Sequence, residues 1–326
     1  MNPVVNPVDV GPTRVHPAAR ESDSVLARIR ASDDLQELAL SALTSCWTDT
    51  HLPADLLPQL LQEALLEPDS EAAATAIAER LSGPAAPAQF RARYERARSR
   101  KFGAFARLLD PWLGRGTVVD LGAGGTDLLD ALATDATLIA VDIELSDPRP
   151  GSRAALLTQI RPDRIPLADD SADTIIATGV LHHIDADVRR RLLADTARVL
   201  GPGGRLLLLE ETFPDPIGAT AGLDGGPPMA EYLDGDPVDL SAADTLFRAL
   251  DLADRMTFLS FTDWWGNRVM KGSLAIPLPY SFLTSEQWRH ELAAAKLVVT
   301  DTQNLGLCSG GGHMASPRML FVCSSE

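Results

Sequence analysis

The chain has 326 residues, 45% of them hydrophobic and 23% charged, a composition typical of a globular protein with one large or two smaller domains. Lysine and arginine total 29 against 45 acidic residues, which gives a formal net charge of -16. So acidic a chain repels phosphate groups, which argues against nucleic acids and anionic membranes as partners. Its three cysteines, at positions 46, 308 and 323, lie too far apart for a disulfide framework or a zinc motif and favour a cytoplasmic location.

The first third of the chain is expected to be helical. Residues 1–21 are rich in proline and glycine and predict a flexible tail without the apolar core of a secretory signal. Apolar residues at helical spacing predict a helical N-terminal extension over 22–113. On its last helix Tyr94, Arg98 and Lys101 share one face. That face either reaches a ligand of the following domain or is simply solvated.

The character of the chain changes at residue 114, where a larger domain is expected to run to residue 326. Short apolar strands are predicted at 117–121, 137–142, 155–160, 173–178 and 204–210. They alternate with helices, which predicts an α/β fold with a doubly wound parallel sheet. Two further strands, 297–302 and 319–323, follow each other without a helix and are expected to pair antiparallel. Residues 212–284 are too many for one crossover and predict an inserted cap.

A glycine loop and an acidic residue indicate a nucleoside-containing ligand. Gly122 and Gly124 follow the first predicted strand, where glycines let a ligand approach the main chain. Asp142 ends the second strand and is placed to accept the hydroxyls of a ribose. A nicotinamide fingerprint would have a third glycine where Asp127 stands, and an acid there opposes a pyrophosphate. The cationic, phosphate-free S-adenosylmethionine tolerates that acid.

Four motifs occur in order: VVDLGAGGTD at 118–127, AVDI at 140–143, IPLADDSADTIIATGVLHHI at 165–184 and LGPGGRLLLLEE at 200–211. With them the chain resembles the class I S-adenosylmethionine-dependent methyltransferases. The resemblance implies a seven-stranded, Rossmann-like sheet of order 3-2-1-4-5-7-6 with the seventh strand antiparallel. It also implies that S-adenosylmethionine is the cofactor. The expected cofactor-binding residues are Asp120, Gly122, Gly124, Asp142, Ile143, Thr178 and Tyr94.

Two positions depart from the family pattern. Thr126 stands where the last glycine of the loop is usual. Arg161 stands where the family commonly has an acid near the adenine amino group. Asp163 or a backbone amide is the expected replacement for that contact.

Histidines are the candidate catalytic residues. His182 and His183 follow the fourth strand, where the acceptor is expected, and the pKa of a histidine suits a general base near neutrality. The alternative is that one of the pair packs or caps the turn near Asp185. His313, in a glycine-rich loop, either reaches the acceptor or lies at an exposed hairpin tip. No metal site is expected, because only two adjacent histidines and scattered acids are present.

The predicted cap contains an unusual cluster, Trp264, Trp265 and Arg268, which either lines a substrate pocket or forms the cap's core. The predicted function is S-adenosylmethionine-dependent methyl transfer, with oxygen of a small-molecule or modified-peptide specialised metabolite as the acceptor. Two alternatives remain open. One is an enzyme that uses the bound sulfonium for rearrangement or cyclisation without methyl transfer, and the other is a noncatalytic nucleoside-binding partner protein.

Overall fold

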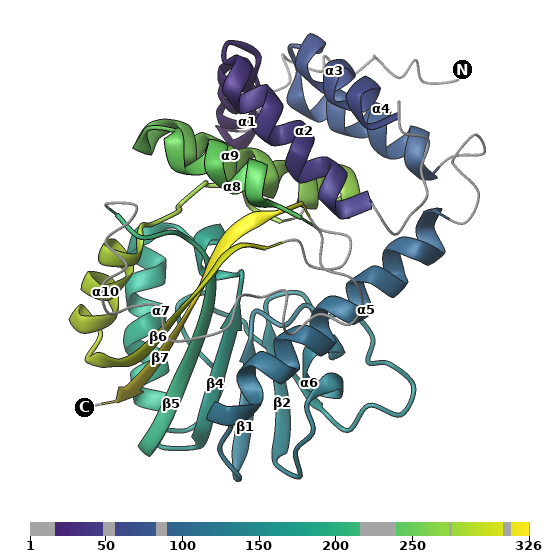
Figure 1. Cartoon of the computed structure of the whole chain (residues 1–326). Coiled ribbons are helices and arrows are strands. Elements are labelled where there is room, and N and C mark those ends of the chain that lie inside the picture. The colour runs from purple at the N-terminus through teal and green to yellow at the C-terminus, as the bar shows by residue number, and fades with distance from the viewer. Residues whose placement is uncertain are drawn as a thin grey trace, which may run out of the picture.

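Seven strands form a single sheet in the order β3-β2-β1-β4-β5-β7-β6 (Figure 1). The computed structural model describes residues 17–47, 56–82, 90–215, 239–273, 276–308 and 314–325. The strands are β1 (Thr117–Leu121), β2 (Thr137–Asp142), β3 (Ala155–Thr158), β4 (Ala172–Thr178), β5 (Leu200–Glu211), β6 (Leu297–Cys308) and β7 (Ser316–Ser325). Strands β1 to β5 pair in parallel, and β7 is antiparallel to both of its neighbours. The predicted α/β fold and strand order are confirmed.

Alternate residues of the strands face opposite layers of helices. Val119 and Leu121 lie in the core beneath α7 (Ala186–Val199) and α10 (Ser285–Ala294). Val118 points to the other side, where α5 (Phe90–Leu109) and the short α6 (Asp127–Ala131) pack. The sheet is therefore buried on both faces, as the continuous apolar runs of a parallel sheet require. Of the helices in the described ranges, none combines the length and apolarity needed to cross a bilayer.

A layer of helices covers the carboxyl ends of the parallel strands (Figure 1). Its N-terminal members are α1 (Pro17–Arg30), α2 (Asp33–Trp47), α3 (Leu56–Leu66) and α4 (Ser70–Ser82). The insertion after β5 adds α8 (Ser241–Ala249), α9 (Leu252–Trp264) and the π-helix η5 (Trp265–Met270). All seven contribute to one hydrophobic core, and Arg28 of α1 donates to Asp254 of α9 at 2.6 Å. We call this layer the helical cap.

Some boundaries differ from those the sequence predicts. Helix α1 begins at Pro17, so residues 17–21 are helical rather than part of a tail, because proline is well suited to the first turn of a helix. Residues 1–16 lie outside the described ranges. Strands β6 and β7 are both longer than expected. Polar residues in β6 and two register shifts, Val299/Asp301 and Asn304/Gly306, obscure the alternation of apolar and polar residues by which a strand is recognised.

Candidate active site

The loop after β1 is shaped by two glycines with positive φ. Gly122 has a φ of 75°, and a Cβ atom there would lie 2.1 Å from Cγ2 of Val180. Gly124 has a φ of 59° but open space around its missing side chain. Gly122 therefore allows the loop to lie directly against the turn that follows β4, where the two histidines begin.

Asp142 at the end of β2 holds this loop in place. Its Oδ2 accepts a hydrogen bond from the Gly124 amide at 2.7 Å, and its Oδ1 accepts one from the Glu144 amide at 3.0 Å. Each carboxylate oxygen keeps a further lone pair, so the group can still accept two hydroxyls. Nearby, Ile143 is exposed and Thr178 is half-buried at the end of β4.

Asp120 is a buried carboxyl group with unused hydrogen-bonding capacity. It is 2% exposed, and its Oδ1 has no hydrogen-bond partner within the described ranges. Burial, with a smaller contribution from the charge of Asp142, raises the pKa of Asp120 to about 7. A cation beside Asp120 would satisfy the buried oxygen and favour its ionised form. The ammonium group of S-adenosylmethionine fits this position, as the open glycine loop and the acceptor oxygens of Asp142 fit its nucleoside.

The structure describes only some of the other side chains that the sequence predicts near the cofactor. Tyr94 and Arg98 lie on α5, but their side chains are outside the described part of the structure. The Nζ of Lys101 lies 5.3 Å from the ring centroid of Phe105. Asp163 forms ion pairs with Arg161 at 3.1 Å and with Arg191 at 2.9 Å. Hydrogen bonding to Arg191, with the charge of Arg161, lowers the pKa of this carboxyl.

The two histidines lie in the 3-10 turn η3 (Leu181–His183), directly after β4. The Nδ1 of His182 lies 2.6 Å from Oε2 of Glu210, near the end of the neighbouring strand β5. The other oxygen of Glu210 accepts hydrogen bonds from the amides of Val180 and Leu181, at 3.1 and 2.7 Å. The ring of His182 also stacks on Phe282. One glutamate thus fixes both the turn and the orientation of the His182 ring.

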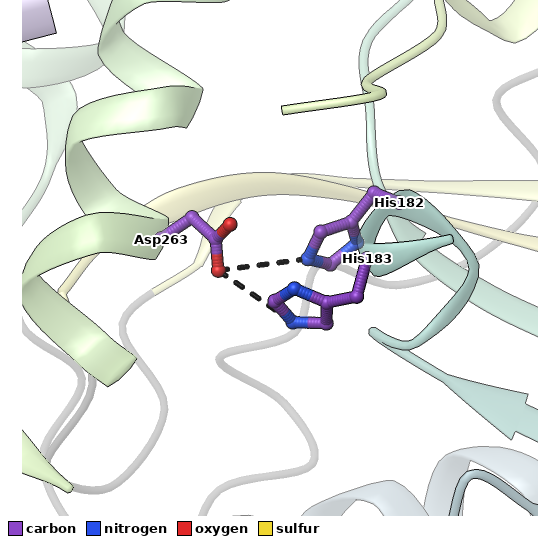
Figure 2. Close-up of side chains that lie close together, drawn as sticks. All are labelled: His182, His183 and Asp263. Carbon is purple, nitrogen blue, oxygen red and sulfur yellow. Dashed lines mark ion pairs between the residues drawn. The ribbon is translucent and has the colours of Figure 1, made fainter. Parts of the chain in front are cut away.

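Asp263, near the end of the cap helix α9, points at both histidines (Figure 2). Its Oδ1 lies 3.7 Å from Nε2 of His182 and 3.6 Å from Nε2 of His183. Asn267, one turn further on, donates to the same Oδ1 at 2.6 Å. The Nδ1 of His183 faces the carbonyl of Pro277 at 3.0 Å. The helical cap and the sheet therefore meet at these three charged or titratable side chains.

The electrostatics of the two histidines differ. Burial opposes a charge on His182, but the carboxylates of Glu210 and Asp263 outweigh it and hold the pKa of His182 well above its ordinary value. The same pairing holds the pKa values of both carboxyls low despite their burial. Burial, aided by the positive charges of His182 and Lys271, lowers the pKa of His183 to about 4 although Asp263 opposes this. His182 is thus the charged member of the pair and His183 the neutral one.

The aromatic and basic residues of the insertion lie inside the helical cap. Trp264 and Trp265 are both fully buried and pack around Phe261 with ring centroids 6.0 Å away. Their indole nitrogens have no hydrogen-bond partner in the ranges that the structure describes. Arg268 donates to the carbonyl of Ser273 at 2.6 Å, and its burial lowers the pKa of its guanidinium. Their role in binding a substrate stays a prediction.

The structure corrects the expectation that acids near the histidines are merely scattered. One ligand atom each from His182, His183 and Asp263 lies within 4.8 Å of the others, so three groups able to hold a metal ion come together. Asp263 follows the histidines by some eighty residues, and no spacing rule connects them. Glu210 was equally missed, although an acid at the carboxyl end of a strand beside β4 is a usable signal. His313, the third histidine, lies outside the described residues.

Comparisons with known proteins agree with the fold and with the motifs. A family described as a methyltransferase domain matches residues 119–208. Uncharacterized methyltransferases of Mycobacterium tuberculosis (strain H37Rv) and Mycobacterium bovis are 35% identical over 131 residues, 37% of this chain and 49% of theirs. The chain thus matches about half the length of these curated relatives.

Solved structures cover more of the chain at lower identity. The 1,6-didemethyltoxoflavin-N1-methyltransferase of Burkholderia thailandensis is 18% identical, with 73% of this chain and 86% of that chain covered and a TM-score of 0.42. A possible exported protein from Bordetella parapertussis is 17% identical, with 96% and 100% covered and a TM-score of 0.44. A methyltransferase-domain family thus matches residues 119–208, the part of the chain that holds most of the four motifs, and the strand order agrees with the one that the resemblance implies.

Proposed function

We propose that the protein transfers the methyl group of S-adenosylmethionine to an oxygen atom of a small molecule or a modified peptide. One observation carries the proposal. The turn with His182 and His183 lies against the glycine loop through the contact between Val180 and Gly122, and Asp263 of the helical cap closes over it. This proximity supports a shared site for the cofactor and for the group that takes up the acceptor's proton.

The residues around the loop divide the work of binding the cofactor. Asp120 would hold the ammonium group of the methionine part, and Asp142 the ribose hydroxyls. When bound, the cofactor supplies an activated methyl group, which an acceptor oxygen takes with its lone pair while the sulfur keeps the electrons of the broken bond. The chain's own contribution is alignment of the acceptor with that bond and exclusion of water.

The helical cap favours a small, largely apolar acceptor. It closes the carboxyl edge of the sheet with a core of leucine, phenylalanine and tryptophan side chains. An alcohol or phenol acceptor must also lose a proton. Because His182 already carries a charge, we assign the role of proton acceptor to the neutral His183, which lies directly beside it. The net charge of -16 supports a substrate other than nucleic acid, and we place the protein in the cytoplasm and in specialised metabolism.

Formation of S-adenosylhomocysteine tests the proposal. The purified protein is incubated with S-adenosylmethionine and a panel of phenols, alcohols, carboxylic acids and peptides, and both products are followed by mass spectrometry. A methylated acceptor with equimolar S-adenosylhomocysteine is expected, and the Asp142→Ala variant serves as the cofactor-binding control. A rearranged product without S-adenosylhomocysteine would replace the proposal with cofactor-assisted isomerisation. Tight cofactor binding without any product would favour a noncatalytic partner protein.

The role of the histidines is tested by single substitutions. On an alcohol or phenol acceptor, His182→Ala or His183→Ala, but not both equally, should lower kcat by roughly 100- to 10,000-fold and spare cofactor affinity. His313→Ala is measured in parallel, and His290→Ala, an exposed histidine on α10, is the control. A carboxylic acid acceptor is already ionised and needs no base, so Arg268 should then matter more. Full activity of all three histidine variants on an alcohol that the unchanged protein methylates would exclude a histidine as the general base.

A further inference from the structure

Three potential ligand groups converge where the helical cap meets the sheet (Figure 2). We propose that His182, His183 and Asp263 bind one divalent transition-metal ion of the zinc or ferrous type. The three ligand atoms lie within 4.8 Å of one another, and the side chains are shielded from solvent, at 3%, 15% and 4% exposure. They come from two elements, η3 after strand β4 and helix α9 of the helical cap.

The hydrogen bonds of both histidines leave the same nitrogen available. The Nδ1 of His182 faces the Glu210 carboxylate at 2.6 Å, and the Nδ1 of His183 faces the Pro277 carbonyl at 3.0 Å. Both partners can only accept, so each Nδ1 carries the proton. The Nε2 of the neutral His183 therefore offers a lone pair, and the Nε2 of the charged His182 offers one once an incoming ion displaces its second proton. Both Nε2 atoms face Asp263. This pattern, with an outer carboxylate or carbonyl orienting each ring, is the usual second layer of a histidine metal site.

The separations in the cluster suit an intervening cation. The Nε2 atoms lie 3.7 and 3.6 Å from Oδ1 of Asp263, too far for hydrogen bonds of normal length. An ion with ligand distances of about 2.0 to 2.2 Å and tetrahedral angles separates its ligands by about 3.4 Å. The two separations between Nε2 and Oδ1 thus need to shorten by only a few tenths of an ångström. The second oxygen of Asp263 is buried and has no hydrogen-bond partner within the described ranges, so it too is available.

The charge balance and the donor types narrow the choice of ion. Glu210 and Asp263 are two buried carboxylates around two imidazoles, and an ion of charge +2 would balance them. Two imidazole nitrogens and one carboxylate oxygen suit zinc, ferrous or related ions, whereas magnesium and calcium prefer oxygen ligands alone. The competing occupant of this space is a proton on His182. The Nζ of Lys271 donates to Oδ1 of Asn267 at 2.9 Å, and Asn267 in turn donates to Asp263.

An ion with three protein ligands keeps a position for an outside ligand. Only the following step rests on the proposed function. If the protein methylates an oxygen atom, that atom of the acceptor is the outside ligand of the ion. The charge of the ion would then lower the pKa of the acceptor hydroxyl, which releases its proton to solvent before methyl transfer. This refinement replaces the histidine base of the proposed function, because His182 and His183 then hold the ion and the proton passes to solvent.

Metal binding is tested on the full chain without cofactor or acceptor, so the result does not depend on methyl transfer. The protein is stripped with a chelator and dialysed, then titrated separately with Zn²⁺, Mn²⁺, anaerobic Fe²⁺ and Mg²⁺ by calorimetry, and metal content is measured after gel filtration. One Zn²⁺ per chain with submicromolar affinity is expected, and no binding of Mg²⁺. His183→Gln and Asp263→Asn should each weaken Zn²⁺ binding by about a hundredfold or more. Glu210→Gln, which only positions a ligand, should weaken it by about 10- to 100-fold.

His290→Gln removes an exposed histidine outside the cluster and should bind Zn²⁺ like the unchanged protein. S-adenosylhomocysteine affinity reports whether each variant is folded. If the variants fail to fold, Co²⁺ added to the unchanged protein should give the visible absorption bands of a four- or five-coordinate ion. The proposal is overturned if Zn²⁺ binds weaker than about 100 μM, or equally well to the Asp263 and His183 variants, which would mean an adventitious ion only. Full methyl transfer by metal-free protein would overturn the role in activating the acceptor.

Discussion

Replacement of Asp120 by asparagine should stabilise the cofactor-free protein at alkaline pH. The carboxyl is buried, and its pKa is raised from an ordinary 3.8 to about 7. The folded state therefore holds this proton more tightly than the unfolded state does. Stability is lost as the pH rises from the ordinary pKa through the folded one, because the unfolded chain ionises first. Asparagine has nearly the same shape and never ionises.

The size of the effect follows from the two pKa values. Each tenfold change in an acid constant is worth about 1.4 kcal/mol, so the raised pKa of Asp120 lowers the free energy of unfolding by about 4 kcal/mol at pH 8 and by under about 2 kcal/mol at pH 5. The advantage of Asp120→Asn should thus grow by roughly 2 to 3 kcal/mol between these pH values. Water that reaches the buried carboxylate would stabilise its ionised form, so the measured gain should not exceed this value. Urea unfolding curves at pH 5 and pH 8, without ligand, measure it, and Asp135→Asn at an exposed position is the control.

The same substitution should weaken cofactor binding. An ammonium group beside Asp120 favours the ionised carboxyl, so S-adenosylmethionine binding near pH 7 should release about half a proton in the unchanged protein and almost none in the variant. Calorimetry in two buffers of different ionisation enthalpy measures this release. The reasoning fails if Asp120→Asn gains no stability between pH 5 and pH 8, or if proton release is the same in both proteins.

Three further outcomes are expected. Asp142→Ala removes charge-assisted hydrogen bonds worth about 1.5 to 3 kcal/mol each, so S-adenosylmethionine affinity by calorimetry should fall at least tenfold, and unchanged affinity would contradict the site. Gly122→Ala should abolish cofactor binding and strongly destabilise the loop, because its Cβ would lie 2.1 Å from Cγ2 of Val180. Gly124→Ala also has a positive φ but open space around the new Cβ, so it should lose only about 1 kcal/mol of stability. Equal losses of stability in the two variants, measured by thermal unfolding, would show that the positive φ and not the contact with Val180 causes the loss. Gel shifts with mixed RNA and DNA at low salt should show no complex, and a salt-sensitive micromolar complex would reverse the inference from net charge.

The sheet could be predicted because its signals are local. Each of β1, β2 and β4 is a short apolar run with a glycine or an acid at its carboxyl end. The order of the strands, by contrast, was implied by the resemblance to the methyltransferases. The extent of strand β6 was harder to predict, because its register shift at Val299/Asp301 changes which residues face the core. Such irregularities depend on the partner strand, which a single pattern does not contain.

The candidate site could be predicted only on the side that the sheet builds. Asp120, Asp142 and the histidine pair lie at or just after the carboxyl ends of three neighbouring parallel strands, and these ends gather at one edge of the sheet. Asp263 reaches the same edge from α9, whose position is fixed by packing against α1 in the helical cap. Contacts between segments so distant in sequence leave no periodic trace, so the third member of the cluster required the structure.

The shared core of the helical cap has a consequence for synthesis on the ribosome. Helix α1 is made early, but its partner Asp254 follows Arg28 by 226 residues. At about 5 to 20 residues per second, the first helices would wait roughly 10 to 45 seconds for α9, while most of the sheet has already been translated. During that interval the apolar face of the N-terminal helices has no permanent neighbour. A holding chaperone that covers this face, or a change in the rate of translation before the insertion, would therefore affect the yield of folded protein.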